Sequence, residues 1–371
     1  MKKLSIQLSG LALLLGLTFT SCKKEATNTS ASNNQEQTLK NEADGAISNK
    51  SGQAAHFEQE YGGLFKTDAL KGNRNIVQVA QSLPIFKSLV AAVVKTDLVS
   101  VLSSKDINAT VFAPTDFAFA KLPAPFNNAT NISNITDQAT INALRNILLY
   151  HVLGTEVKKS DLPAGRSSAV TLKPQVVTDD NRIYLSNNYG LLLINGQSLV
   201  LLPNVDASNG IIHVIDDVLL PPTQNIAQIA TGNPDFSALV AALVKTNLAG
   251  VFAGTGNFTV FAPTNKAFAE LPAPFNNASN ISNITSQSDI NALANILKYH
   301  VTDSRYFTWD LGLFSRITTL ASSPNNKLVG ILGLDRGWIK GNSNQNYSTI
   351  KPSNILATNG VVQVIDHVLL P

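Results

Sequence analysis

Apolar residues recur every three or four positions at the start of two long segments of the chain, which predicts helices with one apolar face. In the first segment these positions lie between residues 76 and 94. A short apolar strand at 110–113 follows, and later apolar runs are broken by Gly and Asn, as is typical of strands joined by turns. Asn209-Gly210 before a β-branched run predicts a hairpin. Helices first and an antiparallel sheet later predict an α+β fold.

The whole pattern occurs twice. Residues 89–98 recur at 239–248 with two changes, and Tyr150-His151 recurs as Tyr299-His300, at an offset of 149 or 150 residues. The Asn-rich stretch 122–136 matches 271–285 at 14 of 15 positions. We therefore predict two tandem domains, residues 76–221 and 222–371, which meet at Pro221-Pro222.

The first 22 residues follow a different pattern, with two lysines, a short apolar stretch and small residues before Cys22. This arrangement resembles a bacterial lipoprotein signal, so we expect residues 1–21 to be a signal peptide and Cys22 to carry a lipid. The alternatives are a membrane-spanning helix and a soluble secreted protein, although the apolar stretch is shorter than the roughly 20 residues that a span needs.

Residues 23–75 contain few large apolar side chains among many Asn, Gln, Ser, Thr and Glu. This composition predicts that the segment 22–75 is a largely disordered tether with an end-to-end distance of roughly 40 Å. The part between residues 56 and 70 has four aromatic or large apolar residues, so it is the part expected to dock on a domain.

Composition and charge narrow the class of function. Charged residues make up 14% of the chain and the net charge is +3, which argues against nucleic acid as a partner. A single cysteine excludes an intrachain disulfide framework and a thiolate metal cluster, and five histidines leave few groups for catalysis. We therefore expect no enzymatic activity, no cofactor and no metal.

Three motifs, each present twice, resemble those of the fasciclin domain. They are TVFAPTDFAF at 110–119, Tyr150-His151, and NGIIHVIDDVLLP at 209–221, with second copies at 259–268, Tyr299-His300 and 359–371. The resemblance implies that each domain is a wedge or sandwich of β-strands flanked by helices. It also implies extracellular adhesion or matrix interaction without general enzymatic activity. The copies differ where the first has His213 and the second Gln363, on a strand face expected to be the more exposed one.

The Tyr-His pairs are candidate binding residues, because the resemblance links this motif to recognition of integrins in animal members. Both histidines fall on the apolar stripe of a predicted helix, together with residues such as Leu144 and Leu293. A buried imidazole held by hydrogen bonds is therefore the first interpretation of His151 and His300, and a binding surface formed with Tyr150 and Tyr299 is the second.

Two positions suggest a surface that only the second copy has. Phe307 aligns with Lys158, and Trp309 aligns with Ser160. Because Lys and Ser favour exposed positions, we expect Phe307 and Trp309 to form an exposed aromatic patch, suited to sugar rings or to a protein interface. The alternative is that both rings fill a locally remodelled core.

These observations lead to two functional hypotheses. The first is a non-enzymatic adhesion or interaction lipoprotein at the outer membrane of a bacterial envelope, whose partner is an extracellular or envelope protein or polysaccharide. The second is a carbohydrate-binding accessory protein of a surface glycan-uptake system that uses the region of Phe307 and Trp309.

Overall fold

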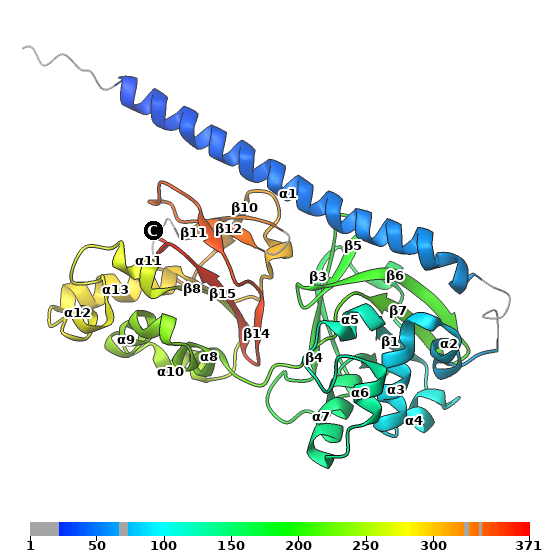
Figure 1. Cartoon of the computed structure of the whole chain (residues 1–371). Helices are drawn as coiled ribbons and strands as arrows, with labels where there is room; N and C mark the ends of the chain where they lie inside the picture. Colours follow the sequence, from blue (N-terminus) through cyan, green and yellow to red (C-terminus); the bar gives the residue numbers. More distant parts are fainter. Residues whose placement is uncertain (1–21, 67–72, 323–325, 334–335) are drawn as a thin grey trace, which may run out of the picture.

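The computed structural model describes residues 22–66, 73–322, 326–333 and 336–371 of the chain. It shows two α+β domains in tandem, as the sequence repeat predicts, and a long helix that lies across both (Figure 1). The signal peptide expected at residues 1–21 lies outside the described residues. The chain therefore has three parts, which we call helix α1, domain 1 and domain 2.

Domain 1 begins with short helices and one strand, continues with further helices and ends with the other strands of its sheet. Its helices are α2 (Ile76–Ser82), η1 (Pro84–Phe86), α3 (Lys87–Lys95), α4 (Val99–Ser103), α5 (Asp116–Ala120), α6 (Ala129–Ser133), α7 (Gln138–Leu149) and η2 (Lys159–Asp161). Its strands are β1 (Ala109–Pro114), β2 (Val152–Leu153), β3 (Gly165–Val170), β4 (Arg182–Asn188), β5 (Leu191–Ile194), β6 (Ser198–Ala207) and β7 (Gly210–Ile215).

Domain 2 repeats this order of elements. Its helices are α8 (Ile226–Gly232), η3 (Pro234–Phe236), α9 (Ser237–Lys245), α10 (Ala249–Ala253), α11 (Asn265–Ala269), α12 (Ala278–Ser282), α13 (Gln287–Tyr299) and η4 (Thr308–Leu311). Its strands are β8 (Phe258–Pro263), β9 (Val301–Thr302), β10 (Ser315–Thr318), β11 (Lys327–Ile331), β12 (Gly337–Lys340), β13 (Ser348–Ile350), β14 (Ile355–Ala357) and β15 (Gly360–Ile365).

Each sheet is mixed rather than antiparallel. In domain 1 the strand order is β2-β1-β7-β6-β5-β4-β3, and β1 runs parallel to β7 while the other neighbours are antiparallel. In domain 2, β8 and β15 form the same parallel pair. A hairpin joins β6 to β7 at Ser208-Asn209, which confirms the turn predicted from Asn209-Gly210. Every residue of β7 and β15 is buried, as expected for strands at the centre of a domain.

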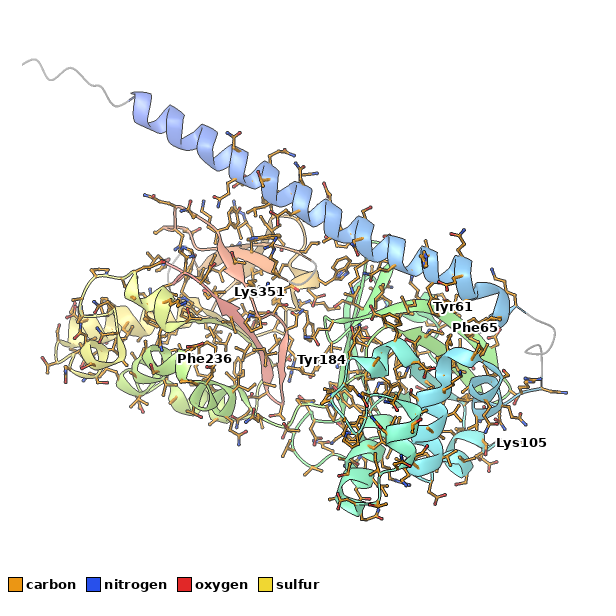
Figure 2. The ribbon with its side chains drawn as sticks, in the orientation of Figure 1. Tyr61, Phe65, Lys105, Tyr184, Phe236 and Lys351 are labelled. Atoms are coloured by element: carbon orange, nitrogen blue, oxygen red, sulfur yellow. The ribbon has the colours of Figure 1, made fainter. Side chains whose placement is uncertain are left out.

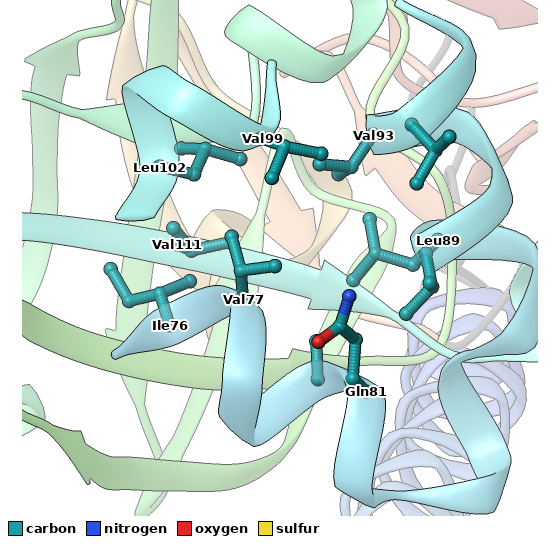
Figure 3. Close-up of a pocket in the computed structure, with 11 residues that line it drawn as sticks. Ile76, Val77, Gln81, Leu89, Val93, Val99, Leu102 and Val111 are labelled. Carbon is teal, nitrogen blue, oxygen red and sulfur yellow. The ribbon is translucent and has the colours of Figure 1, made fainter. Parts of the chain in front are cut away.

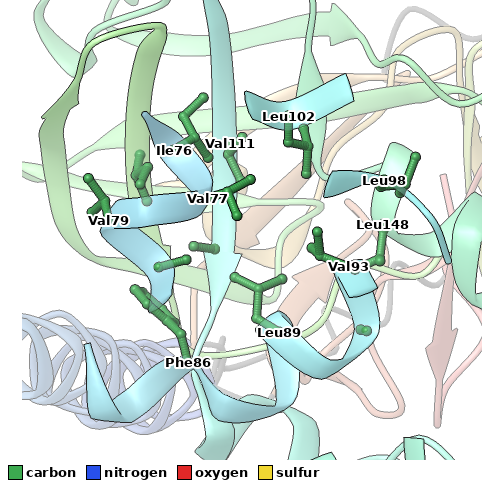
Figure 4. Packing of buried hydrophobic residues seen from close by; sticks show 14 of the residues in the cluster. Ile76, Val77, Val79, Phe86, Leu89, Val93, Leu98, Leu102, Val111 and Leu148 are labelled. Atoms are coloured by element: carbon green, nitrogen blue, oxygen red, sulfur yellow. The ribbon is translucent and has the colours of Figure 1, made fainter. Parts of the chain in front are cut away.

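Each sheet has an apolar cluster on both faces. One cluster of domain 1 packs the helices against the sheet and includes Ile76, Val79, Phe86 and Leu89 (Figure 4). The other lies inside the curve of the sheet, around Phe112 and Leu192. Domain 2 has an equivalent pair of clusters. Thr115 caps α5 as predicted, because its hydroxyl accepts a hydrogen bond from the backbone N–H of Ala118 at 3.2 Å.

Helix α1 (Cys22–Phe65) replaces the flexible tether predicted from composition, so that prediction is wrong. Leu39, Ala43 and Ala46 are buried in a cluster that also contains Leu191 of domain 1 and Trp338 of domain 2. Figure 1 shows α1 in blue, running along both domains.

The buried face of α1 has a helical spacing. The residues on it are 39, 43, 46, 50, 54, 57, 61 and 65, and the last of these pack on domain 1, as expected for the part after residue 56. Alanines and Lys50 make up half of this stripe, so a count of large apolar residues does not reveal it.

A helix that spans a membrane must be long and apolar. None of the described helices meets this requirement alone, and the bent pair formed by α2 and residues 84–95 meets it only when its two parts, at 105° to each other, are taken together.

Candidate functional site

The two histidines of the Tyr-His motifs are buried and fully hydrogen-bonded. His151 Nδ1 donates to the carbonyl of Ile147 at 2.7 Å, and its Nε2 accepts from the backbone N–H of Leu219 at 2.8 Å. His300 has the same two bonds, to Ile296 and from Leu369, each at 2.8 Å. Burial lowers the pKa of both imidazoles to about 4, so both are neutral near pH 7.

The tyrosines of these motifs are internal as well. Tyr150 donates its hydroxyl hydrogen to the carbonyl of Arg182 at 2.7 Å, and Tyr299 donates to the carbonyl of Lys327 at 2.8 Å. Neither ring is exposed. The binding surface predicted for Tyr150, His151, Tyr299 and His300 is therefore wrong, and the first interpretation, a buried polar network, describes all four side chains.

His213 and Gln363 are also buried, which corrects the expectation of an exposed strand face. His213 Nε2 donates to the carbonyl of Val157 at 2.9 Å and its Nδ1 accepts from the N–H of Asn204 at 3.2 Å. Gln363 donates to the carbonyl of Tyr306 at 2.9 Å and accepts from the N–H of Asn354 at 2.8 Å. This strand face is buried because β7 and β15 have apolar clusters on both of their faces. His213 and Gln363 make equivalent hydrogen bonds there.

Phe307 and Trp309 do not form an exposed patch; each is only 2% exposed. Their cover comes from domain 1, where the ring of Tyr184 lies 6.1 Å from that of Phe307, and the ring of Tyr189 meets Trp309 edge-on at 5.7 Å. A side chain at Gly196 would collide with Phe307, since a Cβ there would lie 2.4 Å from the Cβ of Phe307. The equivalent residues of domain 1, Lys158 and Ser160, are exposed as expected.

Arginines complete this contact between the domains. Arg166 of domain 1 donates to the carbonyl of Arg305 at 2.6 Å, and its guanidinium lies 3.8 Å from the centre of the Tyr306 ring. Arg305 in turn lies 4.4 Å from the centre of the Tyr184 ring, which Figure 2 marks between the two domains. Stacking of this kind depends on ring and guanidinium orientation, so the contact favours one arrangement of the two domains.

Beside this interface, Asp310 is largely enclosed. Its Oδ2 accepts from the N–H of Phe307 at 3.0 Å, and burial raises the pKa of its carboxyl to about 6. Its Oδ1 and the indole nitrogen of Trp309 are buried without a hydrogen-bond partner.

Two large hollows lie beneath the second half of α1 and form what we call the α1 groove. A polar hollow of about 780 Å³ is lined by α1, both domains and Lys351, which Figure 2 marks in domain 2. An apolar hollow of about 950 Å³ lies between α1 and domain 1 and includes Tyr61 and Phe117. Asn49, Gln53, Lys121 and Asp216 line both hollows, so the two lie side by side. The α1 groove is the candidate functional site.

The polar side chains of the α1 groove are partly paired. Lys50 of α1 lies 3.5 Å from Asp216, whose other oxygen accepts from the N–H of Leu199 at 2.6 Å. Lys121 lies 2.7 Å from Asp217. Sequence reasoning missed this site because it took the residues of α1 for a tether. The helical spacing that includes Lys50 was the signal that could have revealed it.

A smaller crevice among α2, α3 and α4 is a packing gap (Figure 3). Its volume is about 30 Å³, and its lining includes Val77, Leu89 and Val93. Domain 2 has a similar gap of about 20 Å³. A space of this size, with this lining, has room for little more than one water and offers it almost no polar partner. Within the part of the chain that the structure describes, no group of three His, Cys, Asp or Glu side chains could hold a metal ion.

Comparison with known proteins identifies the two domains. The family model of the fasciclin domain matches residues 84–221 and 234–371. The transforming growth factor-beta-induced protein ig-h3 of Sus scrofa is 30% identical over 262 residues, which are 71% of this chain and 34% of that protein. This chain thus spans about a third of that relative's length.

A bacterial relative and a solved structure add to this comparison. The uncharacterized protein sll1735 of Synechocystis is 37% identical over 146 residues, which are 39% of this chain and 97% of that protein. A solved FAS1 domain pair from the insect cell adhesion molecule Fasciclin I is 18% identical, covers 76% of this chain and 92% of its own, and has a TM-score of 0.35.

Proposed function

Because the chain belongs to the fasciclin family, we propose that it is a non-enzymatic adhesion or interaction protein of the bacterial cell envelope, anchored to the outer membrane by a lipid on Cys22. Its partner would be an extracellular or envelope protein or polysaccharide. The histidines of the two Tyr-His motifs are buried and committed to backbone hydrogen bonds, so neither imidazole is available for catalysis.

The observation that carries this proposal is the path of α1. This helix starts at Cys22 and packs on both domains, so a lipid on Cys22 would be joined to the domain pair by a helix. The 44 residues of α1 extend about 66 Å at 1.5 Å per residue. A lipid at its first residue would hold domain 2 nearer the membrane than domain 1, because the cluster around Leu39 and Trp338 comes before the contacts of Phe57 with domain 1.

The anchor is tested by Cys22→Ser in the organism that makes the protein. We expect the variant to move from the membrane fraction to the soluble fraction, because the lipid would have no attachment site. Ser30→Ala, in the same helix, is the matched control and should stay with the membranes. An unchanged membrane-bound fraction of the Cys22→Ser protein would contradict the anchor.

The interaction role needs a separate experiment. Crosslinking on intact cells with a reagent that does not enter them, followed by purification of this protein, should recover a partner from the envelope or outside it. If the protein is labelled at the surface and no partner is recovered, the adhesive role is contradicted while the anchor can still hold. The carbohydrate hypothesis is based on an exposed patch formed by Phe307 and Trp309, and both rings are buried.

A further inference from the structure

The α1 groove combines an exposed aromatic ring with amide groups and charged side chains of both signs. Phe117 on α5 is 82% exposed although it borders a concave surface, and Gln197 is exposed at the polar end. From this combination we propose that the α1 groove binds a neutral oligosaccharide. This inference rests on the groove alone and requires neither the lipid anchor nor the adhesive role.

The aromatic end of the groove fits a sugar ring. Phe117 and Tyr61 line the same hollow as the aliphatic residues Ile85 and Leu201. The face of a phenyl ring is apolar, and the C–H face of a pyranose can cover it while the hydroxyl groups of the sugar point sideways to polar partners. Leaving a ring as large as that of Phe117 in water is unfavourable, and a stacked ligand would relieve this cost.

The second copy shows that Phe117 is not required by the fold. Its counterpart in the repeat is Lys266, which is exposed on α11. Thr115 and Thr264 cap the two helices in the same way, and Phe119 and Phe268 are both buried. An aromatic ring at position 117 is therefore a feature of the one domain whose α5 faces α1.

The polar end favours a ligand without net charge. Two of its three lysines have carboxylate neighbours, Lys50 with Asp216 and Lys121 with Asp217, and the third is Lys351. The side chains of Asn49 and Gln53 hydrogen-bond to each other at 2.9 Å, an arrangement that still presents amide donors and acceptors to the groove. Amides and paired ions can bond to hydroxyl groups, whereas an anion would have to compete with the existing carboxylates.

The size of the groove suits several sugar units. The two hollows have volumes of about 780 and 950 Å³, near the upper end of the range for small-molecule sites. The lining comes from α1, from domain 1 and, through Lys351, from domain 2. A ligand that touches all three parts would bind only their packed arrangement and would stabilise it.

The test is isothermal titration of the whole chain from residue 22, produced without lipid. The probes are neutral hexasaccharides of β-1,4-glucose, β-1,3-glucose, β-1,4-xylose, β-1,4-mannose and α-1,4-glucose, with a hexasaccharide of galacturonic acid as the charged comparison. We expect saturable binding of at least one neutral probe at one site per chain. Binding of none of the neutral probes, or of the galacturonic acid probe alone, would overturn the proposal.

Variants locate the binding. Phe117→Ala should weaken the affinity for the bound probe at least tenfold, and Gln197→Ala should weaken it several-fold. Both side chains are exposed, so both variants should keep the melting temperature of the unliganded protein, and Lys266→Ala is the matched control that should bind as the wild type does. Equal affinity of Phe117→Ala, Gln197→Ala and the wild type would overturn the assignment to this groove.

Discussion

Domains 1 and 2 have one fold, but equivalent positions in them can hold residues of different chemistry. Inside, His213 and Gln363 differ in chemistry and make the same two hydrogen bonds. At the surface, Lys121 lies 2.7 Å from Asp217 in domain 1, whereas in domain 2 Glu270 lies 3.7 Å from His367. Glu270 stands at the position of Lys121 and His367 at the position of Asp217, and this second contact is an ion pair only when the imidazole is protonated.

The difference between the copies is largest where they touch. Phe307 and Trp309 are buried beneath Tyr184 and Tyr189, while the matching Lys158 and Ser160 of domain 1 face solvent. One face of the shared fold has therefore become an interface in domain 2 and has stayed a surface in domain 1. This teaches that equivalent positions in a tandem repeat need not have equivalent surroundings.

The largest effect is expected when the interface residues of domain 2 are replaced by those at the equivalent positions of domain 1. Phe307→Lys with Trp309→Ser removes two buried rings and brings a charge into the interface, so we expect a loss of at least about 5 kcal/mol in the free energy of unfolding. Domain 2 should melt separately, and the maximum dimension from small-angle scattering should increase.

The reverse exchange in domain 1 is the control for this variant. Lys158→Phe with Ser160→Trp changes exposed positions, so the melting temperature should stay within a few degrees of the wild type. An equal loss of stability in both double variants would show that the interface does not distinguish the two copies.

A smaller effect is expected from the histidines that the copies share. His151→Ala leaves the backbone N–H of Leu219 without a partner and removes one hydrogen bond from the carbonyl of Ile147, and His300→Ala does the same to the N–H of Leu369 and the carbonyl of Ile296. Each variant should lose about 1 to 3 kcal/mol, which is several degrees in melting temperature. Thermal unfolding followed by circular dichroism measures both losses.

These two variants compare the two domains directly, because each should lose nearly the same free energy of unfolding. The hydrogen bonds of His151 and His300 match within 0.1 Å, and both imidazoles have a pKa lowered to about 4. A loss in one domain and none in the other would contradict a shared structural role.

Much of each domain could be predicted from short-range patterns in the sequence. The cap at Thr115, the hairpin at Asn209-Gly210 and the burial of His151 depend on residues a few positions away, and the structure confirms all three. The parallel pairing of β1 with β7 could not be predicted in this way, since it joins residues about 100 positions apart.

The candidate site was harder to predict than the fold. The burial of Phe307 depends on Tyr184, more than 100 positions earlier, so neighbouring residues give no sign of it. The α1 groove depends on a helix whose packing face is made of Ala43, Ala46 and Lys50 as well as larger residues. Such a face has helical spacing but few large apolar side chains, so the amino-acid composition of this segment indicates a tether.

The smallest expected effect concerns the position where the copies differ without a structural cost. His213→Gln puts the domain 2 residue into domain 1, where its amide can donate to the carbonyl of Val157 and accept from the N–H of Asn204, as Gln363 does with the equivalent groups. At pH 7.5 we expect a change in unfolding free energy below about 1 kcal/mol, whereas His213→Ala should lose about 1 to 3 kcal/mol.

The same substitution should matter more in acid. Burial lowers the pKa of His213, so the folded protein holds this imidazole neutral while the unfolded chain takes up a proton as the pH falls below about 6.5. The wild type therefore loses stability from this group between about pH 6.5 and its lower folded pKa, and a glutamine cannot. Chemical denaturation at pH 7.5 and pH 5 should find His213→Gln more stable than the wild type at the lower pH only. A glutamine variant that loses stability equally at both values would contradict the equivalence of the two side chains.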